Sequence, residues 1–131
     1  METTELINLQ ARATALKRRL EELDAAYQSG DEDIGRITRM KAKLETERVQ
    51  ILLGLQETLG ENAPEKFKKA IENAQCPGQD EEVKANLKGV VEEKGLGKQV
   101  IDQINKHKGD VIDLIVSIAV KLAAEMMKRT P

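Results

Sequence analysis

The chain has 131 residues, the size of one ordinary domain, of which 40% are apolar, 34% charged and only 2% aromatic. Its 21 Lys and Arg against 23 Asp and Glu give a formal net charge of −2, which is not the charge of a protein that mainly neutralises nucleic-acid phosphates. One Cys and one His exclude a disulfide framework within the chain and a four-ligand zinc site of Cys and His. The composition is typical of helical bundles, so we predict an all-α protein, not an enzyme, with no cofactor and no metal.

The first predicted element is a long helix from Thr3 to Tyr27 that no Gly or Pro interrupts. Its apolar residues alternate in spacing between three and four positions. They are Leu6, Leu9, Ala13, Leu16, Leu20, Leu23 and Tyr27. This a/d pattern predicts packing against a second helix at a shallow angle.

A second long helix is predicted after Ser29-Gly30, starting at Asp31 or Asp33 and ending at Leu59. Its apolar seam consists of Ile34, Ile37, Met40, Leu44, Ile51, Leu55 and Leu59. Because so few residues join the two helices, we expect residues 1–60 to form an antiparallel hairpin.

The second seam is interrupted at Glu47-Arg48, opposite the small Ala13. Two interpretations stay open: a polar layer that fixes the register, or charged side chains that extend outward into solvent. Gly54, in the middle of the same helix, predicts a close approach of another backbone.

Three apolar residues of the second helix, Val49, Leu52 and Leu53, lie off its seam. One antiparallel helix cannot cover them, so we expect them to pack on the rest of the chain or on another molecule. They are the first candidate partner-binding residues.

Basic residues supply the other candidates. Arg18 and Arg19 on the first helix are expected to face Arg36 and Arg39 on the second, in a positive band that acidic neighbours dilute. The band lacks aromatic residues on which bases could stack, so we predict a solvated or protein-facing surface and not a nucleic-acid site.

Residues 61–131 are predicted to contain four shorter helices. The first is expected to start with an N-cap at Asn62 and Pro64 in its first turn, and the second is expected to start at Asp80. The third is expected to follow Gly95 and to end at about His107, and Asp110 is expected to cap the last. Cys76-Pro77-Gly78 and Gly109 separate them. We expect this segment to form a bundle module, either with its own core or with one core shared with the hairpin.

The last helix is apolar from Val111 to Met127 except at four positions that form one narrow stripe, namely Asp113, Ser117, Lys121 and Glu125. The charges within it favour a buried bundle helix over a membrane span, and insertion into a membrane is the alternative. The first ten residues show no signal peptide, so a cytoplasmic location is expected.

Other chemical motifs are weak. The GLGK stretch at 95–98 lacks the leading Gly of a phosphate-binding loop, where Glu92 stands, and the hydroxyl residue after Lys, where Gln99 stands. It is predicted to end one helix and begin the next. Cys76 and His107 have no catalytic partner near in sequence, so we expect a loop thiol and a surface histidine.

Two sequence segments of the hairpin are similar to segments of a known family. They are LINLQAR at 6–12, followed by Leu16 and KRR at 17–19, and ILLGLQETL at 51–59. Together they resemble the small two-helix effector-associated domains of bacterial conflict systems, over about residues 5–60. The span between the segments is longer than in that family, and the family's loop is replaced by SGDE at 29–32. Arg48 stands where the family tends to be apolar, and residues 61–131 carry no resemblance.

The resemblance implies an adaptor in which like domains on separate proteins pair and bring a sensor to an effector. We therefore expect a protein-binding adaptor in bacterial defence or signalling, with a homo-oligomer among its assemblies. Two alternatives remain: a structural coiled-coil protein that dimerises through the heptad seam, and a membrane-acting effector that uses helix 111–127.

Overall fold

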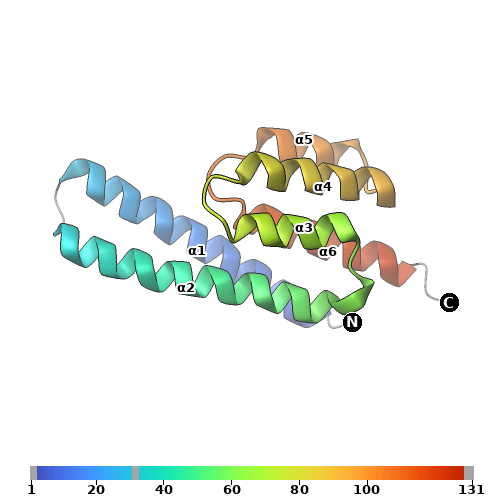
Figure 1. Cartoon of the computed structure of the whole chain (residues 1–131), viewed down its shortest axis with the longest axis horizontal. Helices are drawn as coiled ribbons and strands as arrows, with labels where there is room; N and C mark the ends of the chain where they lie inside the picture. Colours follow the sequence, from blue (N-terminus) through green and yellow to red (C-terminus); the bar gives the residue numbers. More distant parts are fainter. Residues whose placement is uncertain (1–2, 31–32, 129–131) are drawn as a thin grey trace.

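The computed structural model describes residues 3–30 and 33–128, and within these ranges it contains helices and no strand. The predicted all-α fold is confirmed, with a long antiparallel hairpin and a bundle of shorter helices (Figure 1).

The hairpin consists of α1 (Thr3–Ser29) and α2 (Ile34–Leu59). Gly30 follows α1 with a φ of 72°, a left-handed conformation that glycine adopts without strain. Asp33 caps α2, because its carboxylate accepts a hydrogen bond of 3.0 Å from the backbone N–H of Gly35. Of the two predicted starts, the one at Asp33 is therefore confirmed, and Asp31 lies outside the described residues.

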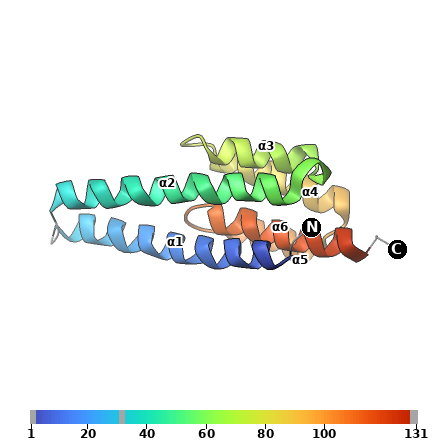
Figure 2. The same ribbon diagram turned by 90° about the horizontal axis from the view of Figure 1, so that it is seen from below.

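The other elements follow in chain order. They are a 3-10 turn η1 (Gly60–Asn62), α3 (Glu65–Ala74), α4 (Asp80–Lys94), α5 (Lys98–Lys106) and α6 (Ile112–Lys128). Helix α6 packs along α1 and also contacts α2, α3 and α4, whereas α5 packs on α4 (Figures 1 and 2).

The predicted N-cap at Asn62 is wrong. Asn62 belongs to η1, and Pro64 occupies the cap position of α3 without a side-chain hydrogen bond. Pro64 has no N–H and a φ of −59°, so it enters the helix without a donor to satisfy. The break at 76–78 and the start of α4 at Asp80 are confirmed.

One buried apolar cluster draws on both halves of the chain. Its largest fully buried side chains include Leu6, Leu16, Ile51, Leu55, Phe67, Ile71, Leu87, Ile104, Ile112 and Ile115. The apolar side of α6 is buried, and the four polar residues of its stripe are partly exposed, as predicted. Among the described residues, no helix is long and apolar enough to cross a membrane.

Helices α1 and α2 extend well beyond the bundle that covers their other half (Figures 1 and 2). We call the projecting part, residues 19–30 and 33–47, the arm. Near the turn, Tyr27 is 55% exposed and Ile34 is 64% exposed, so the seam predicted for these positions is not buried. The reason is that only two helices meet there, and two helices cannot enclose an apolar core.

Arg48 links the base of the arm to the bundle. Its Nε lies 3.0 Å from each carboxylate oxygen of Asp110, and its Nη1 donates to the carbonyl of Ala74 at the end of α3. Asp110 also accepts a hydrogen bond of 2.9 Å from the N–H of Ile112, as expected of a residue that caps α6. Neither interpretation of Arg48 is correct, because its side chain is directed to α3 and α6 and neither towards Ala13 nor outward.

A second polar link joins α1 to α6 close by. His107 Nε2 lies 2.8 Å from Asp113 Oδ1, and Lys17 Nζ lies 3.4 Å from Asp113 Oδ2. Lys84 donates a 3.2 Å hydrogen bond to the carbonyl of His107. The prediction of a surface histidine is wrong, since the His107 side chain is only 10% exposed.

We expect Arg48→Ala to destabilise the fold by about 1–3 kcal/mol, because Asp110 and the Ala74 carbonyl, both partly buried, lose the Arg48 guanidinium as a donor. Urea denaturation followed by circular dichroism measures this. Arg18→Ala, at an exposed position of α1, is the matched control and should change the stability by less than about 0.5 kcal/mol. Equal effects of the two substitutions would contradict the role given to Arg48.

Candidate functional site on the hairpin arm

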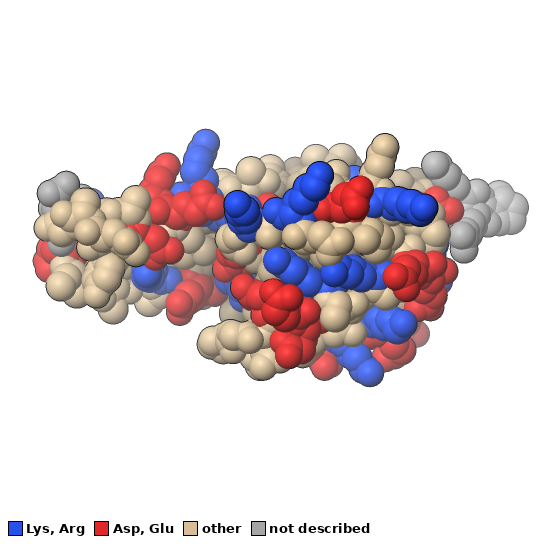
Figure 3. All heavy atoms as spheres, turned by 90° about the horizontal axis from the view of Figure 1, so that it is seen from above, with Lys and Arg blue, Asp and Glu red and all other residues tan. Residues whose placement is uncertain are grey.

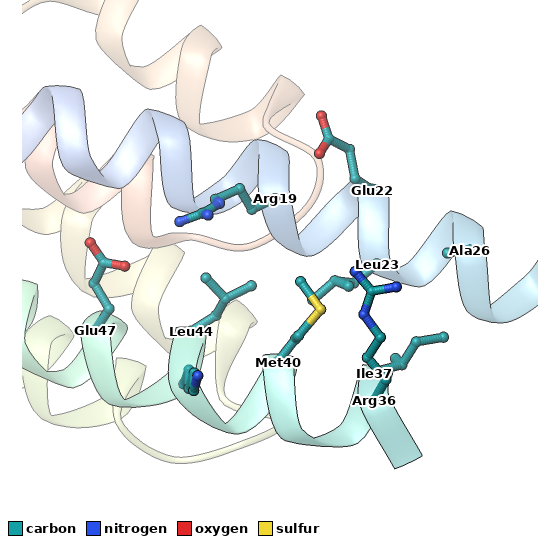
Figure 4. A pocket seen from close by; sticks show the side chains of 10 residues that line it. Arg19, Glu22, Leu23, Ala26, Arg36, Ile37, Met40, Leu44 and Glu47 are labelled. Carbon is teal, nitrogen blue, oxygen red and sulfur yellow. The ribbon is translucent and has the colours of Figure 1, made fainter. Parts of the chain in front are cut away.

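A groove runs between α1 and α2 on the arm, with a volume of about 450 Å³. Its floor consists of Leu23, Ile37 and Leu44, and Met40, which is 37% exposed, also lines it. Figure 4 shows the side chains of Leu23, Met40 and Leu44 pointing into the space between the two helices. Each of these residues belongs to the predicted seams, so the groove is the part of the hairpin seam that no third helix covers.

Charged residues form the two edges of this groove. Arg19 and Glu22 lie on the α1 edge, and Arg36 and Glu47 lie on the α2 edge (Figure 4). Lys43 of α2 also lines the groove. All are exposed except Glu47, which is partly buried and pairs with Arg12 at 3.7 Å. The groove therefore offers an apolar floor between edges of mixed sign, which suits an amphipathic helix better than a uniformly charged ligand.

The groove faces away from the bundle. Lys17 reaches α6, and the Glu21 carboxylate lies beside Gly109, so these positions mark the side of α1 that meets the bundle. Arg19 follows Lys17 by two residues and is therefore about 200° away around the helix axis. A molecule docked in the groove does not collide with the bundle.

The predicted positive band forms only in part. Arg19 and Arg36 both line the groove, whereas Arg18 lies on another face of α1 near Ile7, and Arg39 lies over the first turn of α2 beside Gly35. The bundle engages Lys17 through Asp113. Figure 3 shows rows of Lys and Arg next to groups of Asp and Glu, so basic and acidic residues are mixed on that face.

The three off-seam apolar residues have different environments. Leu52 is fully buried in the core, so the prediction that it contacts a partner is corrected, whereas Leu53 is 47% exposed and Val49 is also exposed. Leu52 points to the side of α2 that the bundle covers, and Leu53, one residue on, is about 100° further around the helix. Gly54 is approached by the side chain of Leu9 and not by a backbone.

The remaining candidates stay outside the groove. Cys76 is an exposed free thiol. Gly95 and Gly97 both have positive φ, of 64° and 103°, and they end α4 and begin α5 as predicted for the GLGK stretch. Within the described residues, no group of three or more His, Cys, Asp or Glu could hold a metal ion.

The sequence predicts only part of the groove. The seam pattern identifies Leu23, Ile37 and Leu44 and predicts that the opposite helix covers them, which the structure confirms, since they are 9%, 3% and 7% exposed. The pattern does not show that no third helix lies over this part of the hairpin, because that depends on how α3 to α6 fold back. The sequence marks Glu47 as an interruption of the second seam, whereas Glu22 and Lys43 stand out only as charged residues.

Comparison with known proteins gives no match, either to a protein-family model or to a curated protein or a solved structure.

Leu52 and Leu53 provide an internal test of the packing. We expect Leu52→Ala to lower the free energy of unfolding by about 2–5 kcal/mol, because it opens a cavity in the core. Leu53→Ala removes the same atoms from an exposed position and should change stability by less than about 0.5 kcal/mol. Thermal and urea unfolding of the two variants measure the difference, and similar values would contradict the assigned burial.

Proposed function

We propose that this protein is a non-enzymatic adaptor that binds other proteins through helical contacts on its projecting arm, in a bacterial defence or signalling system. The observation that carries the proposal is the groove of the arm, where Leu23, Ile37 and Leu44 line an opening between charged edges. The bundle provides a base for the arm, and the arm presents the groove away from it.

The setting in defence or signalling rests on the resemblance of residues 5–60 to effector-associated domains, in which like domains pair. The arm lies within that segment and carries Arg19 and Arg36, two of the predicted partner-binding residues. The projecting hairpin supports recruitment, since a partner helix laid in the groove completes a layer that the chain itself leaves open.

The two alternatives have less support. A coiled-coil protein that dimerises along the whole seam needs the seam to be free, but Leu6, Leu9 and Leu16 are buried in the core. A membrane-acting effector needs the apolar side of α6, yet Ile112, Ile115 and Val116 are fully buried. Either function requires the bundle to open first.

A photo-crosslinking amino acid at Met40, inside the groove, tests the proposal in cells that produce the chain. We expect a discrete adduct with another protein chain, because a partner helix would lie within reach of this side chain. The same amino acid at Glu92, an exposed position of α4 on the bundle, is the control and should give none. Identical products from both positions, or none from either, would count against the groove as the binding site.

A further inference from the structure

We propose that the occupant of the groove is the arm of a second copy of this chain, docked antiparallel about a two-fold axis. The inference rests on the proposed function, because it uses the same groove and names the partner. In this arrangement the axis lies in the interface, perpendicular to the arm, so α1 faces α1 and α2 faces α2 of the second copy.

The order of charges along the groove carries the inference. On the α1 edge, Arg19 is nearer the bundle and Glu22 is nearer the turn. On the α2 edge the order is reversed, with Glu47 nearer the bundle and Arg36 nearer the turn. The α1 edge therefore has one basic and one acidic end, and the α2 edge has Arg36 at the turn end and Glu47 at the bundle end, with Lys43 between them. An antiparallel copy places the opposite charges at these ends against each other on both edges.

One position of the two-fold axis brings opposite charges together on both edges of the groove. The midpoint of Arg19 and Glu22 lies between residues 20 and 21, and the midpoint of Arg36 and Glu47 lies between residues 41 and 42. Because α1 ends at Ser29 and α2 starts at Ile34, these two midpoints are level within about one residue, or about 1.5 Å of helix rise. One two-fold axis at this level pairs Arg19 with Glu22 and Arg36 with Glu47, each pair occurring twice, and Glu47 then lies between Arg36 of the second copy and Arg12 of its own chain.

The centre of the same arrangement is apolar. Leu23, Met40 and Leu44 surround the axis level, and Lys43 is placed opposite Met40 of the second copy, where its aliphatic stem can cover the thioether. Two arms joined in this way form a four-helix bundle, the architecture in which helices with one uncovered apolar face become buried.

Charge also disfavours the parallel arrangement. A two-fold axis along the arm places α1 against α2 of the second copy at the same level. Arg19 is then opposite Lys43, so like charges meet on both sides of the interface. Because the antiparallel pairing is self-complementary and the parallel one is repulsive, the groove itself sets the direction of the second copy.

A charge-reversal exchange on the full chain tests the inference, with sedimentation velocity over a hundredfold range of concentration as the readout. The wild type is expected to dimerise reversibly. Arg19→Glu and Glu22→Arg each place like charges together twice in a homodimer, so each variant should weaken dimerisation by about tenfold or more. An equimolar mixture of the two variants should dimerise again, because the heterodimer restores two opposite-charge pairs.

Arg18→Glu is the matched control, since its side chain lies on a different face of α1 and should leave dimerisation unchanged. Arg19 and Glu22 are exposed, so both variants should keep the circular dichroism of the wild type. A wild type that stays monomeric, a mixture that stays monomeric, or an Arg18→Glu effect equal to that of Arg19→Glu overturns the second copy as the antiparallel occupant.

The result separates this inference from the proposed function. If the chain is monomeric but the crosslinker at Met40 gives an adduct with a different protein, and Arg19→Glu weakens that adduct, the groove function stands and the second copy is rejected. If the chain is monomeric and Met40 gives no adduct, both are rejected. An adduct of about twice the 14.6 kDa chain mass, lost in Arg19→Glu and regained in the mixture, supports both.

Discussion

The structure depends on a mismatch of helix lengths. The hairpin helices have 27 and 26 residues, whereas α6, the longest helix that covers them, has 17. At 1.5 Å per residue this leaves about 15 Å of the hairpin without a third helix. The core, the exposed seam residues near the turn and the groove all follow from that difference, because a helix pair can bury its apolar stripe fully only where another layer covers it.

The polar contacts lie where the bundle stops covering the hairpin. Arg48 binds Asp110 and the Ala74 carbonyl, and Lys17 and His107 converge on Asp113, all at the start of α6. Charged groups are suited to this boundary because they are partly buried on the bundle side and reach solvent on the other. Since each side chain joins elements distant in sequence, the same contacts hold the hairpin at one position relative to the bundle.

Local patterns in the sequence predict the helices well. The a/d spacing, Gly30, Asp33 and the 76–78 turn depend on neighbouring residues, and the structure confirms the elements that they predict. The failures concern tertiary contacts. Leu52 and Leu53 are adjacent and identical in type, and only the position of the bundle makes one buried and the other exposed. Arg48 and His107 likewise meet partners that no local pattern indicates.

The composition of the groove limits the kind of association that it can support. Its apolar floor is small, with three buried residues and Met40, so apolar contact alone is weak compared with that of an obligate dimer. In the proposed function, the charges of mixed sign on its edges select the partner and its direction, because exposed ion pairs contribute more to selectivity than to affinity. Contacts made by such a surface are expected to be reversible and sensitive to salt. Both properties suit the proposed adaptor, which would have to exchange one copy of itself for another partner.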